Sequence, residues 1–284
     1  MAKMADFKSQ ASFDNEKQIA MEVSIIIVNY NMRGLVKNCL KSVLESQFSL
    51  PYEIIVVDNN SGDQVEEMLK EKFKTVKLIK AASNKGMGAG ANLGLREAGG
   101  KYVLILNPDI HLFPNSLQTM YDYIKDKPEV GILAPQLLNA NRTVQSSCYR
   151  WHSFWTPIFR RSSLKLLPFG KRDLSRFLME DFAQNETREV PWIQCSCWLL
   201  PRRILLEIGF FDERFFMYFE DTDFCRRVKQ AGFKNIYHAE AQVIHLHRRA
   251  SADGGLFNFL FNKLTRAHIV SWIKYMIKWR KSKF

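Results

Sequence analysis

The chain has 284 residues and a net charge of +12, and 46% of its residues are hydrophobic. This length suffices for one large domain with appendages, and the hydrophobic share is ordinary for a globular protein. The positive charge favours anionic partners such as nucleotides, phosphorylated lipids or membrane surfaces. A nucleic-acid partner is not expected, because no DNA- or RNA-binding motif is visible. No apolar run approaches the roughly 18 residues of a membrane-spanning helix.

The start of the chain and its cysteines indicate a cellular setting. Residues 1–20 are polar, mixed in charge and without a secretory signal, so we expect a disordered tail. The five cysteines are odd in number and scattered, which favours buried reduced thiols over disulfides or a zinc site. Both features predict a cytoplasmic protein.

Short apolar runs and amphipathic stretches alternate four times in the first part of the chain. The β-branched run over 23–28 predicts a strand buried on both faces, and apolar residues at helical spacing follow over 33–46. The same alternation predicts strands over 53–57, 76–79 and 102–106, a helix near 65–69 and a helix over 89–98 closed by two glycines. Such alternation is typical of a parallel sheet with right-handed crossovers.

Four polar residues stand directly after strands of this predicted sheet: Asn29, Asp58, Asn84 and Asp109. Because ligands of parallel sheets lie beyond the carboxyl ends of the strands, we expect these side chains along one rim. The stretch Asn84–Asn92 is rich in glycine and opens a helix, so its backbone can approach a phosphate or a sugar closely. Its glycine spacing does not fit a dinucleotide fingerprint, which argues against a dehydrogenase.

Asp109 and His245 are candidate ligands of a divalent metal. Asp109 follows an apolar strand and Pro108, where a carboxylate can hold Mg²⁺ or Mn²⁺ or instead cap the helix that follows. His245 and His247 would share one face of a predicted strand. A lone buried histidine is more often a satisfied core residue, but the neighbouring carboxylates favour a metal site.

The segment Glu220-Asp221-Thr222-Asp223 directly follows a run of aromatic residues. Aromatic neighbours remove water from a carboxylate, which raises its pKa and makes it a better general base. Asp223 and Arg227 are four residues apart and would pair across one helical turn. We therefore expect a structural role for Asp223 and the chemical role for Asp221, with Glu220 beside it.

Two basic segments flank this candidate chemistry. Residues 142–190 are irregular and rich in tryptophan and arginine, and we interpret them as an insertion that lines a second, acceptor-side binding region; a solvated basic loop is the alternative. Residues 254–284 hold seven basic residues and no acidic residue, with apolar residues at helical spacing. A basic amphipathic helix of this kind suits an anionic membrane surface, although a terminal helix packed on the core is the alternative.

Six motifs in chain order resemble the inverting family 2 glycosyltransferases with the GT-A fold, most closely their bacterial rhamnosyltransferase-like members. They cover about residues 22–250. The motifs are Val23–Asn31, Ile55–Ser61, Asn84–Gly88, Leu106–Asp109, Gly209–Phe216 running on to Glu220–Asp223, and Val243–His245. The resemblance implies an α/β fold: a Rossmann-like, mostly parallel central sheet flanked by helices, over residues 21–253, with a C-terminal basic amphipathic helix.

The resemblance also implies roles for single residues. Asp58 would contact the base of a nucleotide, and the backbone near Asn29 and Tyr30 would hold the same moiety. Asn84 and Gly86 would belong to the nucleotide-sugar site.

At the reaction centre the resemblance assigns Asp109 to the metal that bridges the diphosphate, and His245 to the same metal shell. Asn107 stands where the first aspartate of the family's Asp-x-Asp motif often lies. Asp221 matches the general base, with Glu220 beside it. Cys195-Ser196-Cys197 replaces the family's usual Gly-Ala, and the bulkier Cys195 narrows the expected pocket for donor sugar and acceptor.

The function implied is a metal-dependent inverting transfer of a sugar from a nucleotide-diphosphate donor. Resemblance favours dTDP-rhamnose, and a UDP-hexose stays open. The acceptor would be a cell-surface polysaccharide or a polyprenyl-diphosphate-linked oligosaccharide, at the inner face of the cytoplasmic membrane. Two other functions are less well supported. A nucleotidyltransferase would carry a glycine-rich basic signature after the first strand, which is absent here. A catalytically silent subunit that docks on membrane would have no need of the Glu220–Asp221 pair.

Overall fold

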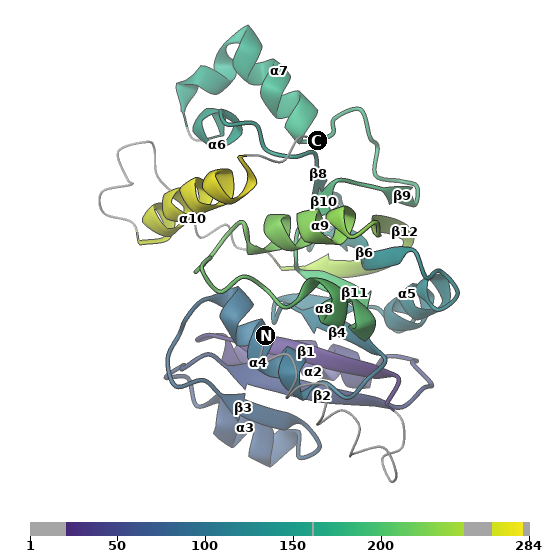
Figure 1. The fold of residues 1–284 in the computed structure, drawn as a ribbon. Coiled ribbons are helices and arrows are strands. Elements are labelled where there is room, and N and C mark those ends of the chain that lie inside the picture. Colours follow the sequence, from purple (N-terminus) through teal and green to yellow (C-terminus); the bar gives the residue numbers. More distant parts are fainter. Residues whose placement is uncertain (1–20, 161, 247–262, 281–284) are drawn as a thin grey trace.

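The structure is a computed structural model that describes residues 21–160, 162–246 and 263–280 (Figure 1). The expected tail over 1–20, His247 and the start of the C-terminal segment lie outside the described residues. The strands are β1 (Val23–Asn29), β2 (Tyr52–Asp58), β3 (Lys77–Lys80), β4 (Tyr102–Leu106), β5 (Ile110–Leu112), β6 (Val130–Leu138), β7 (Val144–Gln145), β8 (Cys148–Tyr149), β9 (Arg188–Glu189), β10 (Trp192–Ile193), β11 (Cys197–Pro201) and β12 (Lys234–His245).

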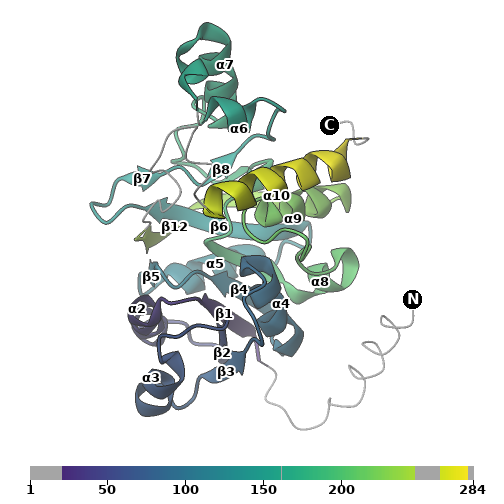
Figure 2. The same cartoon turned by 90° about the vertical axis from the view of Figure 1, so that its left-hand side faces the viewer.

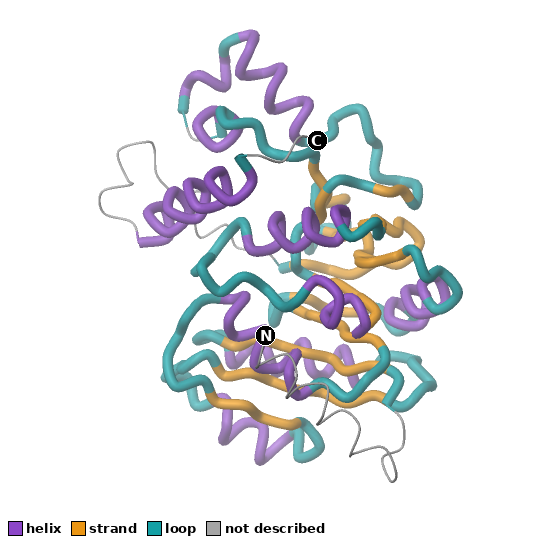
Figure 3. The backbone as a smooth tube through the Cα atoms, in the orientation of Figure 1, coloured by secondary structure: helices purple, strands orange, loops and turns teal. Residues whose placement is uncertain are grey.

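Helices alternate with these strands along the chain, and Figure 3 draws them in purple around the orange strands of the sheet. They are α2 (Arg33–Leu44), α3 (Val65–Lys72), α4 (Met87–Glu97), α5 (Ser116–Ile124), α6 (Thr156–Phe159), the 3₁₀ helix η1 (Ser163–Leu166), α7 (Pro168–Phe177), α8 (Arg202–Ile208), α9 (Glu220–Gln230) and α10 (Lys263–Trp279).

The main sheet has the strand order β3-β2-β1-β4-β11-β6-β12-β5. Its first four strands run parallel, which confirms the prediction made from the alternating pattern. Beyond β4 the sheet is mixed, because β11 is antiparallel to both neighbours and β12 runs parallel to β6 but antiparallel to β5. The carboxyl ends of β1, β2, β3 and β4 therefore meet at one rim, where parallel sheets hold their ligands.

Helices lie on both sides of the sheet (Figure 2), and alternate side chains of the central strands supply two separate cores. Ile25 and Ile27 of β1 pack with residues of α2, α3 and α5, whereas Ile26 packs with residues of α4, α8 and α9. Because both faces are covered, the strands read as continuous apolar runs in the sequence. The sheet is thus a rigid platform for the loops at its rim.

Helix α10 lies alongside α9 in both views (Figures 1 and 2). Tyr275 and Trp279 are buried against Phe215 and Phe219, in the loop that leads into α9. One face of the C-terminal helix therefore packs on the core. No helix within the described residues combines the length and the apolar character needed to cross a bilayer.

Candidate active site

The first part of the site lies at the ends of β1 and β2. Asn29 is fully buried, and its amide donates to Asp58 Oδ1 at 3.3 Å, Ser61 Oγ at 3.1 Å and Asp63 Oδ1 at 3.2 Å. Asp58 in turn accepts the backbone N–H of Ser61 at 3.1 Å. Tyr30 is 45% exposed beside this cluster. The rim thus offers an exposed ring next to an ordered set of carboxylates, which suits a flat ligand with hydrogen-bond donors.

The second part is the glycine-rich loop between β3 and α4. Asn59 donates its amide to Asn84 Oδ1 and to the carbonyl of Gly86, each at 3.0 Å, and Asn84 Oδ1 also accepts the Gly86 N–H at 2.9 Å. These bonds tie the loop to the end of β2. The structure therefore brings Asn29, Asp58 and Asn84 to one rim, as the sequence predicted, and Gly86 lies beside them.

The backbone at Gly86 accommodates no residue with a side chain. Its φ is 102°, and a Cβ there would lie 1.9 Å from the carbonyl oxygen of Phe216. Gly88 is also tightly placed, since a Cβ there would lie 3.1 Å from Cβ of Phe211, and it would touch Cβ of Glu220 at 3.6 Å. The glycines thus let this loop touch the segment that enters α9.

Replacing Gly86 by Ala is expected to lower the free energy of unfolding by about 2–5 kcal/mol, the sum of backbone strain and overpacking. Thermal unfolding measures it. The matched control is Gly34→Ala on α2, where a Cβ meets nothing within 4 Å and φ is ordinary. An equal melting temperature for both variants would contradict the close packing of this loop.

Asp109 and His245 meet at the far side of the rim. Asp109 follows β4, His245 ends β12, and Asp109 Oδ2 lies 3.4 Å from His245 Nε2. The backbone joins them too, because the Leu246 N–H donates to the Asp109 carbonyl at 2.8 Å. Asp109 Oδ1 is buried and has no hydrogen-bond partner. A buried carboxylate oxygen without a donor is costly unless it binds a cation.

Gln145 of β7 sets the histidine tautomer. Its Nε2 donates to Asn139 Oδ1 at 3.3 Å, so its Oε1 faces His245 Nδ1 at 2.6 Å. The Oε1 atom therefore accepts a hydrogen bond from the Nδ1–H group. In the neutral ring this leaves the lone pair of Nε2 toward the Asp109 carboxylate, the arrangement that a metal ligand needs. That arrangement is stable when a cation lies between the two groups, so the pair fits a divalent metal.

Glu220 and Asp221 open helix α9, directly after two aromatic residues with left-handed backbone, Tyr218 at φ 67° and Phe219 at φ 66°. Asp221 is partly exposed and Glu220 is 8% exposed. Asp221 Oδ1 accepts the Thr222 N–H at 2.7 Å, and its Oδ2 accepts the Cys195 N–H at 3.4 Å. Two backbone donors thus orient the Asp221 carboxylate.

Loss of water raises the pKa of both carboxyl groups. For Asp221 burial is the main cause, and its hydrogen bonds from Thr222 and Cys195 oppose the rise. For Glu220 burial again dominates, and the nearby Asp221 charge raises its pKa further. Burial also raises the pKa of the Cys195 thiol, which therefore stays protonated and is not a nucleophile at neutral pH. The predicted desolvation of the pair by aromatic neighbours is in agreement with these shifts.

The backbone of Cys195 and Ser196 links the two carboxylate clusters. The Cys195 N–H contacts Asp221, and the Ser196 carbonyl accepts the Asn107 N–H at 2.9 Å, two residues before Asp109. Strand β11 follows at once, antiparallel to β4. The departure from the usual Gly-Ala that the sequence revealed therefore lies between the candidate base and the candidate metal ligand.

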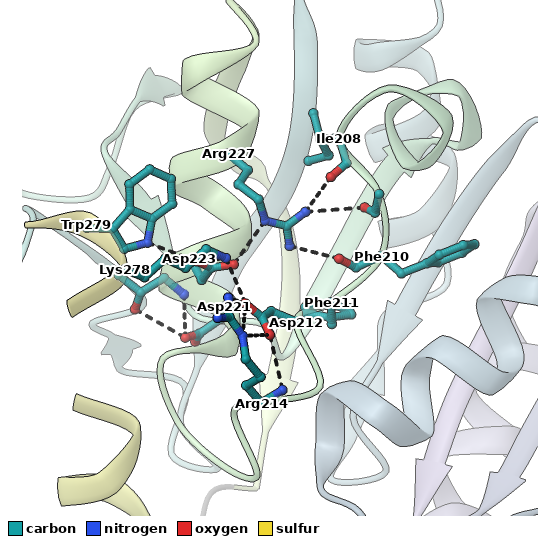
Figure 4. Close-up of polar contacts among 12 residues, drawn as sticks. Ile208, Phe210, Phe211, Asp212, Arg214, Asp221, Asp223, Arg227, Lys278 and Trp279 are labelled. Atoms are coloured by element: carbon teal, nitrogen blue, oxygen red, sulfur yellow. Dashed lines mark hydrogen bonds and ion pairs between the residues drawn. The ribbon is translucent and has the colours of Figure 1, made fainter. Parts of the chain in front are cut away.

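Asp223 is fully buried one turn into α9 and holds three partners (Figure 4). Arg227 Nε lies 3.0 Å from Oδ2, as the four-residue spacing predicted. From α10, Trp279 Nε1 donates to Oδ1 at 2.9 Å, and Lys278 Nζ lies 2.6 Å from the same oxygen. Lys278 also reaches Asp212 Oδ2 at 2.9 Å. The C-terminal helix is therefore fastened to the helix that begins with Glu220 and Asp221.

Sequence reasoning missed several residues of this site. Asn59 and Ser61 belong to the motif Ile55–Ser61, and their polar side chains next to Asp58 are a signal for a binding role. Gln145 and Trp279 gave no signal, because they reach the site from distant segments.

Comparison with known proteins gives the family of the chain. The sequence matches the family described as "Glycosyl transferase family 2" over residues 24–209. It is similar to an N-acetylglucosaminyl-diphospho-decaprenol L-rhamnosyltransferase of Mycobacterium tuberculosis (strain ATCC 25618 / H37Rv), with 28% identity over 72% of this chain and 69% of that protein. It is also similar to the low-salt glycan biosynthesis hexosyltransferase Agl10 of Haloferax volcanii, with 28% identity over 78% of this chain and 66% of that protein.

Among solved structures, the fold resembles the mannosyltransferase PcManGT of Pyrobaculum calidifontis in complex with GDP-Man and Mn²⁺. The TM-score is 0.59 at 17% identity, over 99% of this chain and 72% of that chain. This likeness supports the GT-A fold predicted from the motifs. Since the family match covers more than half of the 284 residues, the chain belongs to glycosyl transferase family 2 and is a glycosyltransferase.

Proposed function

We propose that this enzyme transfers a sugar, with inversion, from a nucleotide-diphosphate donor to a hydroxyl group of a lipid-linked oligosaccharide or cell-surface polysaccharide. The donor favoured is dTDP-rhamnose, with UDP-hexoses as the alternative. The observation that carries the proposal is the Asp221 carboxylate. It is partly exposed, it is oriented by two backbone N–H groups, and burial raises its pKa toward that of a useful base.

The reaction needs no enzyme nucleophile. Asp221 accepts the proton of the acceptor hydroxyl while that oxygen forms a bond to the anomeric carbon. The bond to the nucleoside diphosphate breaks on the opposite face, and the diphosphate leaves with its electron pair. Because attack and departure are on opposite faces, the anomeric configuration inverts. The Cys195 and Thr222 N–H groups hold Asp221 in place throughout.

Binding of the donor is assigned to the rim of the parallel strands. Asp58 and Tyr30 would meet the nucleotide, and the loop with Asn84 and Gly86 would line the sugar-phosphate region, beside Asn107. The tight hydrogen bonds among Asn29, Asp58 and Ser61 support a preformed site for the base.

Asp109 and His245 would hold the divalent metal, Mg²⁺ or Mn²⁺. A bound metal of this kind supplies charge to stabilise the departing diphosphate. The described residues contain no cluster of three or more acidic, histidine or cysteine side chains able to hold a metal, so phosphate oxygens of the donor would complete the shell. Metal affinity should therefore depend on the nucleotide.

Replacing Gln145 by Ala is expected to weaken Mn²⁺ binding about 10–100-fold, because the His245 ring loses the acceptor that fixes its tautomer. Titration of Mn²⁺ by electron paramagnetic resonance, with nucleoside diphosphate present, measures the affinity. The control is Gln118→Ala on α5, whose amide contacts Asp122 at the surface. Unchanged affinity in the Gln145 variant would remove His245 from the proposed metal shell.

The proposed acceptor is supported by the name of one relative. The mycobacterial relative is named for a lipid-linked acceptor, and the insertion over 142–190 would lie on the acceptor side of this site. With such an acceptor the enzyme would act in the cytoplasm, in peripheral contact with the inner face of the membrane.

A donor-binding panel tests the proposed function. The full chain is heated with dTDP-rhamnose, UDP-glucose, UDP-galactose, UDP-GlcNAc or GDP-mannose, each with and without Mn²⁺. One donor should raise the melting temperature by mass action, and more so with Mn²⁺. If every nucleotide sugar leaves the melting temperature unchanged, the donor site proposed here is wrong.

A further inference from the structure

Exposed apolar side chains gather in two short stretches of the chain. Among the described residues, sixteen large hydrophobic side chains are exposed, and nine of these belong to residues 154–169 and 270–277. Six lie in the insertion: Phe154, Trp155, Leu164, Leu166, Leu167 and Phe169. Three lie on α10: Val270, Ile273 and Ile277. Single exposed apolar residues are normal, but a cluster of this size marks an interaction surface.

Aromatic contacts join the two stretches into one surface, which we call the α7–α10 surface. The Trp272 ring of α10 lies 5.1 Å from Phe154, which lies 5.3 Å from Trp155. Trp155 stacks on Phe159 at 6.3 Å, and Phe159 lies 5.6 Å from Phe169 of α7. Ring contacts therefore connect α10 to α7 by way of Phe154, Trp155 and the buried Phe159, and both views place α6 and α7 on the side of the molecule where α10 lies (Figures 1 and 2).

The outward stripe of α10 carries basic residues and no acidic residue. Val270, Ile273 and Ile277 are 47%, 47% and 60% exposed, and they lie on one side of the helix. Arg266 and Lys274 of the helix are exposed, as is Arg280 directly after its end. The opposite side is already occupied, because Tyr275 and Trp279 are buried against Phe215 and Phe219. Lys274 also donates to the Arg214 carbonyl at 2.7 Å, so the side chains of the stripe that remain exposed are its apolar residues Val270, Ile273 and Ile277.

The insertion contributes further positive charge. Lys165, Lys171 and Arg172 line a hollow of about 590 Å³ between η1 and α7, in which Glu180 is the single acidic residue. The one carboxylate of α7, Asp173, points inward, where it accepts a hydrogen bond from Thr156 and pairs with Arg176. The exposed charge around the α7–α10 surface is thus strongly positive.

We propose that the α7–α10 surface docks on the face of an anionic bilayer. Its apolar side chains would enter the boundary between headgroups and acyl chains, and its lysines and arginines would lie at the lipid phosphates. A second copy of this chain is a poorer occupant, because a two-fold interface would set the same positive charges against each other. In the context of the proposed function, docking would bring the helix that begins with Glu220 and Asp221 to a lipid-linked acceptor.

Vesicle co-sedimentation of the full chain tests the proposal. The probes are vesicles of phosphatidylcholine alone and of phosphatidylcholine mixed with phosphatidylglycerol. The wild type should bind the mixed vesicles, and added salt should weaken that binding, by about fivefold for each basic residue screened. The double variant Ile273→Glu/Ile277→Glu should bind about tenfold more weakly or worse, because two apolar side chains no longer enter the bilayer.

A matched control separates the surface from a general effect of added charge. Leu206 of α8 is 55% exposed and lies outside the α7–α10 surface, so Leu206→Glu should bind vesicles as the wild type does. The proposal would be overturned if the double variant and the wild type bound anionic vesicles equally well, or if the wild type did not bind them. Sedimentation velocity without lipid gives the last check. If the wild type is a dimer and the double variant is a monomer, a second copy of the chain covers this surface.

The experiment is independent of catalysis. Vesicle binding needs no donor and no acceptor. A wild type that binds vesicles yet transfers no sugar would therefore contradict the proposed function and leave the docking proposal intact. Conversely, the double variant should keep full transfer to a water-soluble acceptor, because its substitutions face away from the site.

Discussion

The variant Asp221→Asn is expected to transfer sugar about 10²–10⁴-fold more slowly than the wild type, the usual contribution of a positioned general base. Asparagine keeps the shape of the side chain and the oxygen that accepts the Thr222 N–H, so donor binding should be unchanged. The variant should also be at least as stable at neutral pH, because burial disfavours the charged form of Asp221 in the folded state. Steady-state kinetics with a donor titration separates kcat from KM.

The pH dependence gives a second readout of the same residue. A base must be ionised to act, and burial raises the pKa of Asp221. The wild-type kcat/KM should therefore fall as the pH drops through a value above the usual aspartate range of about 4. The residual activity of the asparagine variant should lack this acidic limb. Retained turnover with an unchanged pH profile would assign the proton transfer to another group.

The variant Asp223→Ala is expected to lower the free energy of unfolding by about 3–5 kcal/mol. Its carboxylate is fully buried and pairs with Arg227 and Lys278 while accepting the Trp279 N–H. Alanine would leave these groups partly buried without their shared acceptor. For a domain of this size the loss corresponds to roughly 10 °C in melting temperature. Calorimetry or circular dichroism measures it.

An exposed ion pair provides the control for this variant. Asp122 on α5 pairs with Lys125 at 2.7 Å, but its side chain is 49% exposed. Asp122→Ala should cost at most about 1 kcal/mol, because exposed pairs contribute little. If both variants melted at the same temperature, α10 would not be fastened through Asp223.

The parallel half of the fold was predictable because its signals are local. Continuous apolar strands such as Val23–Val28 are recognised from a few consecutive residues, and the loops after them carry the polar side chains. The rim positions of Asn29, Asp58 and Asn84 followed from the sheet alone. The mixed half was not predictable, because β11 and β12 enter the sheet from far along the chain and nothing in their composition sets their direction.

The same distinction applies to the candidate site. The desolvated pair Glu220 and Asp221 was visible, since its aromatic neighbours are adjacent in sequence. The partners that make the geometry specific were not visible, since Gln145 and Trp279 are 100 and 56 residues away from His245 and Asp223. The sequence predicts a C-terminal helix with apolar residues at helical spacing. In the structure the apolar residues of α10 lie on two sides of the helix, a buried side with Tyr275 and an exposed side.

The most direct test of the central claim measures release of the nucleoside diphosphate from each donor, with and without an N-acetylglucosaminyl-diphospho-lipid acceptor. The account predicts release with one donor, dependent on the acceptor and on Mn²⁺, and lost in Asp221→Asn. The product should have the anomeric configuration opposite to that of the donor, as seen by nuclear magnetic resonance. Release that is equal in the wild type and in Asp221→Asn, or a product of retained configuration, would contradict it.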